Sequence, residues 1–106
     1  MITELVLFDL PEGMTREEVV AQMRATTPHW RSCPELVRKN CIYDPQARQA
    51  GGVYLWRDEA AARRWHGEAR HLRIREVYGS VPVIRYFETP VLIDNALDQV
   101  IEEATA

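Results

Sequence analysis

Lysine, cysteine and long apolar runs are all scarce in this sequence, and each scarcity argues against a class of protein. The longest uncharged apolar stretches have about five residues, far fewer than the roughly 20 that a membrane-spanning helix needs. The N-terminus lacks a basic leader, so we expect a cytoplasmic protein with no membrane partner. Cys33 and Cys41 are too few for a disulfide framework and come without metal-ligand spacing, so we expect two small buried hydrophobic residues and no metal.

Positive charge is also in short supply. The net charge is -3 and the isoelectric point is about 5.6. Nucleic-acid affinity comes from clustered cations that neutralise phosphates, so we expect no nucleic-acid partner. Lys39 is the only lysine, and every other cationic side chain is arginine. We therefore expect an anion bound inside the protein to meet a planar, permanently charged guanidinium group.

The composition that remains is that of an ordinary globular domain, with 46% hydrophobic and 27% charged residues. A chain of 106 residues can bury about two thirds of its surface, which is enough for one core. We therefore expect residues 1–106 to form a single domain.

Apolar periodicity, caps and breakers predict six elements in the order strand, helix, strand, strand, helix, strand. Thr15 and Glu18 have the spacing of a capping box at the start of the first helix. Pro28 ends that helix, so His29 to Pro34 is expected to be a connector. The predicted ranges are Ile2 to Leu10, Thr15 to Thr27, Leu36 to Asp44, Gly52 to Arg57, Asp58 to Tyr78 and Val81 to Glu88.

The second helix is predicted to run from its cap at Asp58 until Gly79 ends it, although Gly67 weakens it. Its expected inner stripe consists of Ala61, Ala62, Trp65, Ala69 and Leu72. After the last strand, residues 94–106 are expected to form a C-terminal arm. The arm contains a short amphipathic tail from Ala96 to Glu103 with Leu97, Val100 and Ile101 on one side.

This order is the ferredoxin-like α+β arrangement, a four-stranded antiparallel sheet with both helices on one face. The uncovered face would alternate apolar with polar residues if it met water. Leu5 to Phe8 instead place apolar side chains in both phases, and Val53 to Trp56 and Val83 to Phe87 repeat this pattern. Because monomers rarely expose large apolar patches, we infer a homodimer joined through the sheet faces.

Several stretches carry a family resemblance, and they are Gly51 to Trp56, Asp58 to Ala62, Arg73 to Glu76, Tyr78-Gly79 and Ile84 to Pro90. They resemble the monooxygenases of the dimeric α+β barrel superfamily, which are related to antibiotic-biosynthesis monooxygenases. The resemblance covers roughly residues 2 to 95. It implies a ferredoxin-like protomer, a dimer joined through its sheets, and a small-molecule cavity between sheet and helices.

Related branches of that superfamily include cofactor-free oxygenases of phenolic polyketides, haem-degrading enzymes and lactone isomerases, so the fold alone does not select a reaction. A cofactor-free oxygenase needs an apolar pocket for an aromatic substrate, a base, and a cation beside the developing oxyanion. Expected substrate-binding residues are His29, Trp30, Tyr43, Tyr54, Trp56, Trp65 and Tyr86. The alternative for each of these aromatic residues is that it packs in the hydrophobic core and binds no ligand.

Two residues are candidates for catalysis. His66 follows Trp65 and is expected at the border between core and solvent, either as a catalytic base or as a surface residue. Arg85 shares a strand phase with Phe87 and is expected to meet an oxyanion or to pair with a carboxylate across the dimer. Weaker candidates are Lys39, Asn40 and Arg75, whereas Arg63, Arg64 and Arg70 are expected on the solvated side of the second helix.

The leading hypothesis is a monooxygenase that acts on a small aromatic or phenolic compound with no metal or flavin cofactor. The alternative is a ligand-binding or stress-associated dimer without catalysis. A minor alternative is a haem-binding or haem-degrading protein, because Trp56 and His66 resemble the tryptophan and histidine of that branch. The first strand lacks the asparagine that the haem-degrading branch carries.

Overall fold

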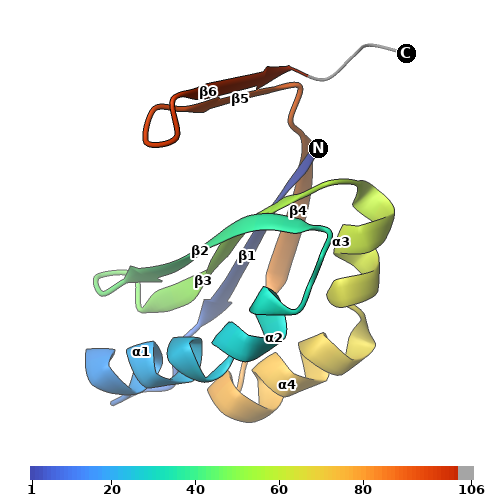
Figure 1. Ribbon diagram of the computed structural model, residues 1–106. Helices are drawn as coiled ribbons and strands as arrows, with labels where there is room; N and C mark the ends of the chain where they lie inside the picture. Colours follow the sequence, from blue (N-terminus) through green and yellow to red (C-terminus); the bar gives the residue numbers. More distant parts are fainter. Residues whose placement is uncertain (103–106) are drawn as a thin grey trace.

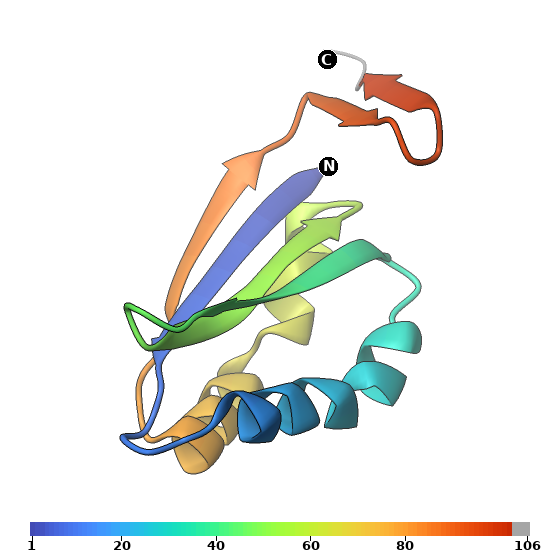
Figure 2. The same ribbon diagram turned by 90° about the vertical axis from the view of Figure 1, so that its left-hand side faces the viewer.

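The computed structural model describes residues 1–102 and contains the predicted four-stranded sheet. Its strands are β1 (Ile2–Asp9), β2 (Leu36–Asp44), β3 (Gln49–Trp56) and β4 (Val83–Glu88). They are antiparallel neighbours in the order β2-β3-β1-β4, with β1 and β3 in the centre. All the helices lie on one side of the sheet (Figures 1 and 2). The predicted ferredoxin-like α+β fold is therefore confirmed.

The first helical segment begins as predicted. Helix α1 (Arg16–Ala25) is capped by Thr15, whose Oγ1 accepts a hydrogen bond of 3.2 Å from the backbone N–H of Glu18. The expected connector after Pro28 is wrong in part, because a second short helix, α2 (Thr27–Arg31), follows. Proline is compatible with the first turn of a helix, where its missing N–H would have no partner anyway. Pro28 therefore lies in the first turn of α2 and does not end helical structure there.

The predicted second helix is two helices, α3 (Glu59–Trp65) and α4 (Glu68–Tyr78), separated by His66 and Gly67. His66 has φ -110° and ψ 42°, outside the helical region. The break changes which side chains of α4 face the sheet. Leu72, expected inside, is 50% exposed, and Ile74 is buried in its place.

The core lies between the helices and one face of the sheet. On β1 the even-numbered residues Glu4, Val6 and Phe8 are buried, and on β3 the same holds for Tyr54 and Trp56. On the opposite face, β4 exposes apolar side chains to solvent within this chain. The structure thus decides between the two apolar phases that the sequence left equivalent.

A feature that the sequence did not predict is a second small sheet formed by β5 (Val91–Asp94) and β6 (Gln99–Glu102). This hairpin extends beyond the end of the main sheet, beside the N-terminus (Figure 1). It is tied to β2 by an ion pair of 2.9 Å between Asp94 and Arg38. The amphipathic tail is therefore wrong over the described residues, because neighbours in a strand such as Val100 and Ile101 point to opposite faces. Glu103, its predicted end, lies outside the described residues.

Two further expectations can be compared with the structure. Cys33 is buried, but Cys41 is exposed, so the prediction of two buried cysteines is wrong for the second. Cys41 lies on β2, an edge strand of the four-stranded sheet in residues 1–102. In residues 1–102, no helix is long and apolar enough to cross a lipid bilayer.

Candidate active site

A buried carboxylate lies at the centre of the helix-covered face of the sheet. Glu4 of β1 has no exposed surface, and strand alternation places it beside Val6. Its Oε1 accepts a hydrogen bond of 2.9 Å from Nε1 of Trp56 and lies 2.6 Å from Nδ1 of His66. A carboxylate withdrawn from water needs such partners, because burial without them is strongly unfavourable.

His66 is the histidine partner of this carboxylate and is only 3% exposed. It occupies the C-cap of α3, and the break in the helix turns its ring toward the sheet. The predicted border position is therefore wrong, because it assumed an uninterrupted helix. The bond to Glu4 assigns a proton to Nδ1, so the neutral ring presents its lone pair at Nε2. A carboxylate that orients a histidine in this way is the arrangement that general bases use.

Aromatic rings surround His66. The centroid of its ring lies 4.6 Å from that of Tyr54, 5.2 Å from that of Trp30 and 6.2 Å from that of Trp56. Burial raises the pKa of Tyr54, so its phenol stays protonated at neutral pH. These three predicted substrate-binding residues therefore form one cluster with the predicted catalytic histidine.

Two cationic side chains approach the same cluster. Nζ of Lys39 lies 4.3 Å from the ring centroid of Trp30 and 4.6 Å from that of Tyr54. Cζ of Arg70 lies 4.9 Å from the ring centroid of Trp30. Burial lowers the pKa of Lys39 to about 8 and also lowers the pKa of Arg70. The sequence analysis expected a guanidinium group beside a bound anion. The structure places two cationic groups beside the aromatic cluster, the ammonium of Lys39 and the guanidinium of Arg70.

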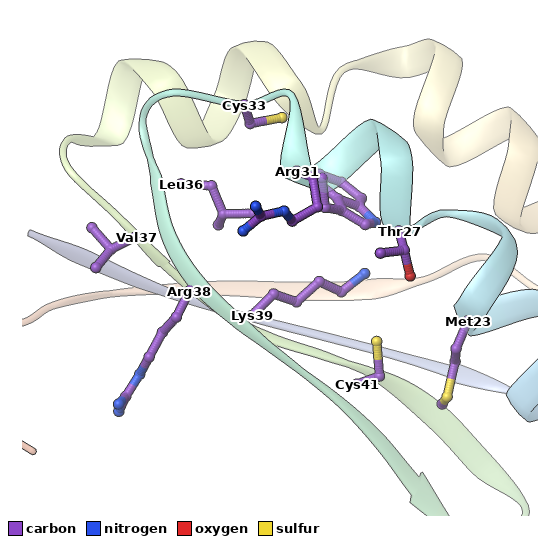
Figure 3. Close-up of a pocket in the computed structure, with 10 residues that line it drawn as sticks. Met23, Thr27, Arg31, Cys33, Leu36, Val37, Arg38, Lys39 and Cys41 are labelled. Carbon is purple, nitrogen blue, oxygen red and sulfur yellow. The ribbon is translucent and has the colours of Figure 1, made fainter. Parts of the chain in front are cut away.

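Two adjoining cavities reach this cluster. The inner one, of about 50 Å³, lies between the sheet and the helices and is lined by Tyr54, His66 and Arg70 among others. The outer one, of about 390 Å³, lies between α2 and β2 and includes Trp30 in its wall (Figure 3). Both cavities are lined by Met23, Lys39 and Cys41. The volume of the outer cavity is within the range of small-molecule sites, whereas the inner one has room for little more than water.

The other predicted binding residues are spread more widely. His29 contacts the cluster through Trp30, and the ring centroids of His29 and Trp65 lie 5.4 Å apart. Nε1 of Trp65 donates a hydrogen bond of 2.8 Å to Glu35. Tyr43 and Tyr86 lie on β2 and β4, the two opposite edges of the sheet. These two tyrosines therefore do not share a wall of one pocket.

Tyr86 is nevertheless close to the buried carboxylate, because it pairs with Glu4 across β1 and β4. Burial, and then the charge of Glu4, raise the pKa of Tyr86 to about 12. Oε2 of Glu4 is buried and has no hydrogen-bond partner in the described part of the chain. The outer side of the Tyr86 ring is covered by Arg63, whose Cζ lies 4.5 Å from the centroid.

Arg85 lies on the other face of the sheet from His66. It pairs with Leu5 of β1, and its Cζ lies 4.7 Å from the ring centroid of Phe87 on that same face. The structure therefore does not bring the two predicted catalytic residues together within this chain.

Sequence reasoning missed two members of the site. Glu4 shares its strand phase with Val6 and Phe8, and a carboxylate in an apolar row is a signal that it needs a partner. Arg70 was assigned to the solvated side of a continuous helix, but the break at Gly67 turns it inward. In residues 1–102, no group of three or more His, Cys, Asp or Glu side chains is placed to hold a metal ion.

The fold and this site define a ferredoxin-like α+β protein with an aromatic, histidine-containing cluster under its helices. Residues 5–88 match the family described as putative mono-oxygenase ydhR, and the chain belongs to that family. The resemblance seen in the sequence motifs is thereby confirmed. Membership of the family supports a monooxygenase-type function. No curated protein sequence matches the chain.

Solved structures with the same fold include oxygenases. SnoaB, a cofactor-independent oxygenase from Streptomyces nogalater, has a TM-score of 0.62 and 16% identity, with 83% of this chain and 91% of that chain covered. The ActVA-Orf6 monooxygenase of Streptomyces coelicolor, solved with Nanaomycin D, has a TM-score of 0.63 and 17% identity, covering 83% and 86%. PA3566 from Pseudomonas aeruginosa has a TM-score of 0.61 and 19% identity, covering 83% and 92%. At these identities the likeness shows the fold alone.

Proposed function

We propose that this protein is a monooxygenase that oxidises a small aromatic or phenolic compound with molecular oxygen and without a metal or flavin cofactor. The observation that carries the proposal is the buried pair of Glu4 and His66 inside a cluster of aromatic rings, beside a cavity of about 390 Å³. Family membership and the oxygenase named among the fold relatives support the same reaction class.

The proposed chemistry begins with proton removal. Nε2 of His66 accepts a proton from an acidic C–H or O–H group of the substrate, and Glu4 stabilises the resulting imidazolium. Lys39 and Arg70 stabilise the substrate anion, which is electron-rich enough to reduce oxygen. With a substrate such as anthrone, a CH₂ group and O₂ become a carbonyl group and water. With a hydroquinone, the ring and O₂ become a hydroxyquinone and water. In both reactions one oxygen atom is incorporated into the product and the other leaves as water.

Oxygen uptake by the pure protein tests this proposal, with anthrone and a hydroquinone as substrates. We expect uptake with wild type and a loss of roughly 100-fold or more in His66→Gln, which is the usual contribution of a positioned general base. His71→Gln is the matched control, because His71 lies on α4 and does not line either cavity. Thermal melting of each variant verifies that it is folded.

Wild type that takes up no oxygen with either substrate, or uptake that is unchanged in folded His66→Gln, would contradict the proposal. Tight binding of the aromatic compound without any uptake would favour the alternative, a ligand-binding protein without catalysis. Added haemin that causes no Soret shift would dispose of the haem-binding alternative.

We also propose that the protein is a homodimer joined through the uncovered faces of its sheets. This face carries apolar side chains from three strands, and Val83 and Phe87 are 63% and 38% exposed in the single chain. The hairpin beyond the sheet exposes further apolar side chains, among them Ile93 and Val100, each 65% exposed. A second copy would remove this apolar surface from water.

A further inference from the structure

Two cations of the site have no anionic partner. In the part of the chain that the structure describes, neither Lys39 nor Arg70 forms an ion pair with a carboxylate. Glu4, the carboxylate whose charge acts on Lys39, is already bonded to His66 and Trp56. Cations that are withdrawn from water without a counter-charge are unfavourable, and the faces of aromatic rings compensate only in part.

Unused hydrogen-bond donors accompany these charges. Nε of Arg70 and Nε1 of Trp30 are both buried, and neither has an acceptor in residues 1–102. Lys39 and Arg70 both lie against the Trp30 ring, so the unpaired donors and the two charges belong to one place. Buried donors normally have partners, and an anionic ligand with several acceptor lone pairs would supply them.

The position of Lys39 connects the two cavities. Its side chain extends from β2 toward α2 across the outer cavity, whereas Arg38 points away from it (Figure 3). Lys39 also lines the inner cavity that contains His66. A Cβ on Gly52 would lie 3.0 Å from Cε of Lys39 and 2.8 Å from Cε1 of Tyr54. The glycine therefore leaves the space in which the lysine and tyrosine side chains lie.

We propose that Lys39 and Arg70 form an anion subsite, which binds the carboxylate of an aromatic acid and makes the protein select acidic over neutral aromatic compounds. The ammonium group and the His66 ring contact the same two rings, Trp30 and Tyr54, so one small aromatic molecule can reach both. The inference deepens the proposed function, since it names the substrate class for the same site. The inference can be tested by measuring ligand binding, without any assay of oxygen uptake.

Calorimetric titration with 2-naphthoate and 2-naphthalenemethanol compares an acid with a neutral compound of the same ring system. We expect wild type to bind the acid at least tenfold more tightly at pH 7 and low salt, and the preference to fall as sodium chloride is raised. Lys39→Met and Arg70→Met should each lose most of the preference, whereas Lys39→Arg should keep it. Arg63→Met is the matched control, a cation on the Tyr86 ring outside both cavities.

Equal binding of the two compounds by wild type, no binding of either, or a preference that is independent of salt would overturn the inference. So would an unchanged preference in Lys39→Met and Arg70→Met that melt cooperatively. The wild-type measurements decide the matter even where a variant fails to fold. A preference for the acid without oxygen uptake would contradict the proposed function and leave the anion subsite standing, and oxygen uptake without the preference would do the reverse.

Discussion

The pair of Glu4 and His66 makes the centre of this small protein polar. Its members come from positions 62 residues apart, one on β1 and one between α3 and α4. Trp56 completes the arrangement by donating to the same carboxylate oxygen. Charged hydrogen bonds in a buried site contribute more than neutral ones, so we expect the pair to affect stability as well as the proposed chemistry.

Glu4→Gln is expected to lower both the stability of the fold and the rate of the proposed reaction. The amide keeps the shape and one acceptor oxygen, but it removes the charge that holds and stabilises the His66 imidazolium. We expect oxygen uptake to fall at least tenfold and the free energy of unfolding to fall by about 1–3 kcal/mol, measured by urea denaturation. Glu12→Gln, in an exposed loop, is the control and should change neither. An unfolding free energy equal to that of wild type would show that the buried charge has no structural role.

Lys39 makes stability depend on pH in the alkaline range. Its pKa is about 8 in the folded protein, because of burial, against 10.5 when unfolded. Between these values the unfolded chain binds more protons, so stability rises with pH; below about pH 8 the penalty is complete, and above 10.5 it is gone. The groups that face the ammonium are Glu4, His29, Cys41, Tyr54 and Arg70.

The measurement is the free energy of unfolding of wild type minus that of Lys39→Met, from pH 7 to 10.5. We expect this difference to increase with pH by at most about 3 kcal/mol. A difference that stays flat, or that decreases with pH, would mean that the lysine is as well solvated in the folded protein as in the unfolded chain.

At the scale of elements, the break between α3 and α4 positions the site. Asp58 caps α3 through a hydrogen bond of 2.8 Å from the N–H of Ala61. Seven residues later α3 ends, and α4 begins at Glu68, where the N-cap residue Gly67 offers no side-chain hydrogen bond. The interruption lets His66 point to Glu4 and brings Arg70 against Trp30.

The close approach of β1 and β3 requires a glycine at position 51. A Cβ on Gly51 would lie 1.8 Å from the carbonyl oxygen of Val6, which is backbone and cannot move alone. We expect Gly51→Ala to lower the free energy of unfolding by about 3 kcal/mol or more.

Gly67→Ala is the matched control for Gly51→Ala. Its Cβ would meet nothing closer than the carbonyl oxygen of Arg64 at 3.7 Å, so only the preference for glycine over alanine at an N-cap is lost. We expect a change within about 1 kcal/mol in urea denaturation. Equal effects of the two substitutions would show that β1 and β3 can separate to accept the side chain.

At the scale of the whole molecule, the sheet has one face covered by helices and one uncovered. Val83 lies on the uncovered face, paired with Leu7, and is 63% exposed. In a monomer, an aspartate there would stay in water and cost little. In a sheet-to-sheet dimer it would be buried opposite apolar side chains.

We therefore expect Val83→Asp to raise the dissociation constant of the dimer at least tenfold, measured by sedimentation equilibrium. Val81→Asp is the control, since Val81 is 68% exposed and precedes β4. Wild type that sediments as a monomer at micromolar concentration would contradict the dimer.

Local patterns were enough for the order of the four strands of the main sheet and for the start of α1, but not for α2, for the division between α3 and α4, or for the hairpin of β5 and β6. Leu36 to Asp44 is a strand exactly over the predicted range, and the Thr15 cap lies where its spacing to Glu18 indicated. Caps, turns and alternation act over a few residues, so they are legible in the sequence. The aromatic members Tyr54 and Trp56 were found for the same reason, because residues two apart on a strand share a face.

Tertiary packing determined which side chains meet at the candidate site. Both phases of β1 are apolar, so only the position of the helices shows that Glu4 faces the core and that Arg85 faces away. The inward turn of His66 and Arg70 follows from the break at Gly67, where a glycine can either remain in a helix or interrupt it. Lys39 lies against Trp30 because the fold brings α2 opposite β2 across the outer cavity. Such contacts join residues distant in the chain, and their free energy depends on the whole arrangement, which no local pattern contains.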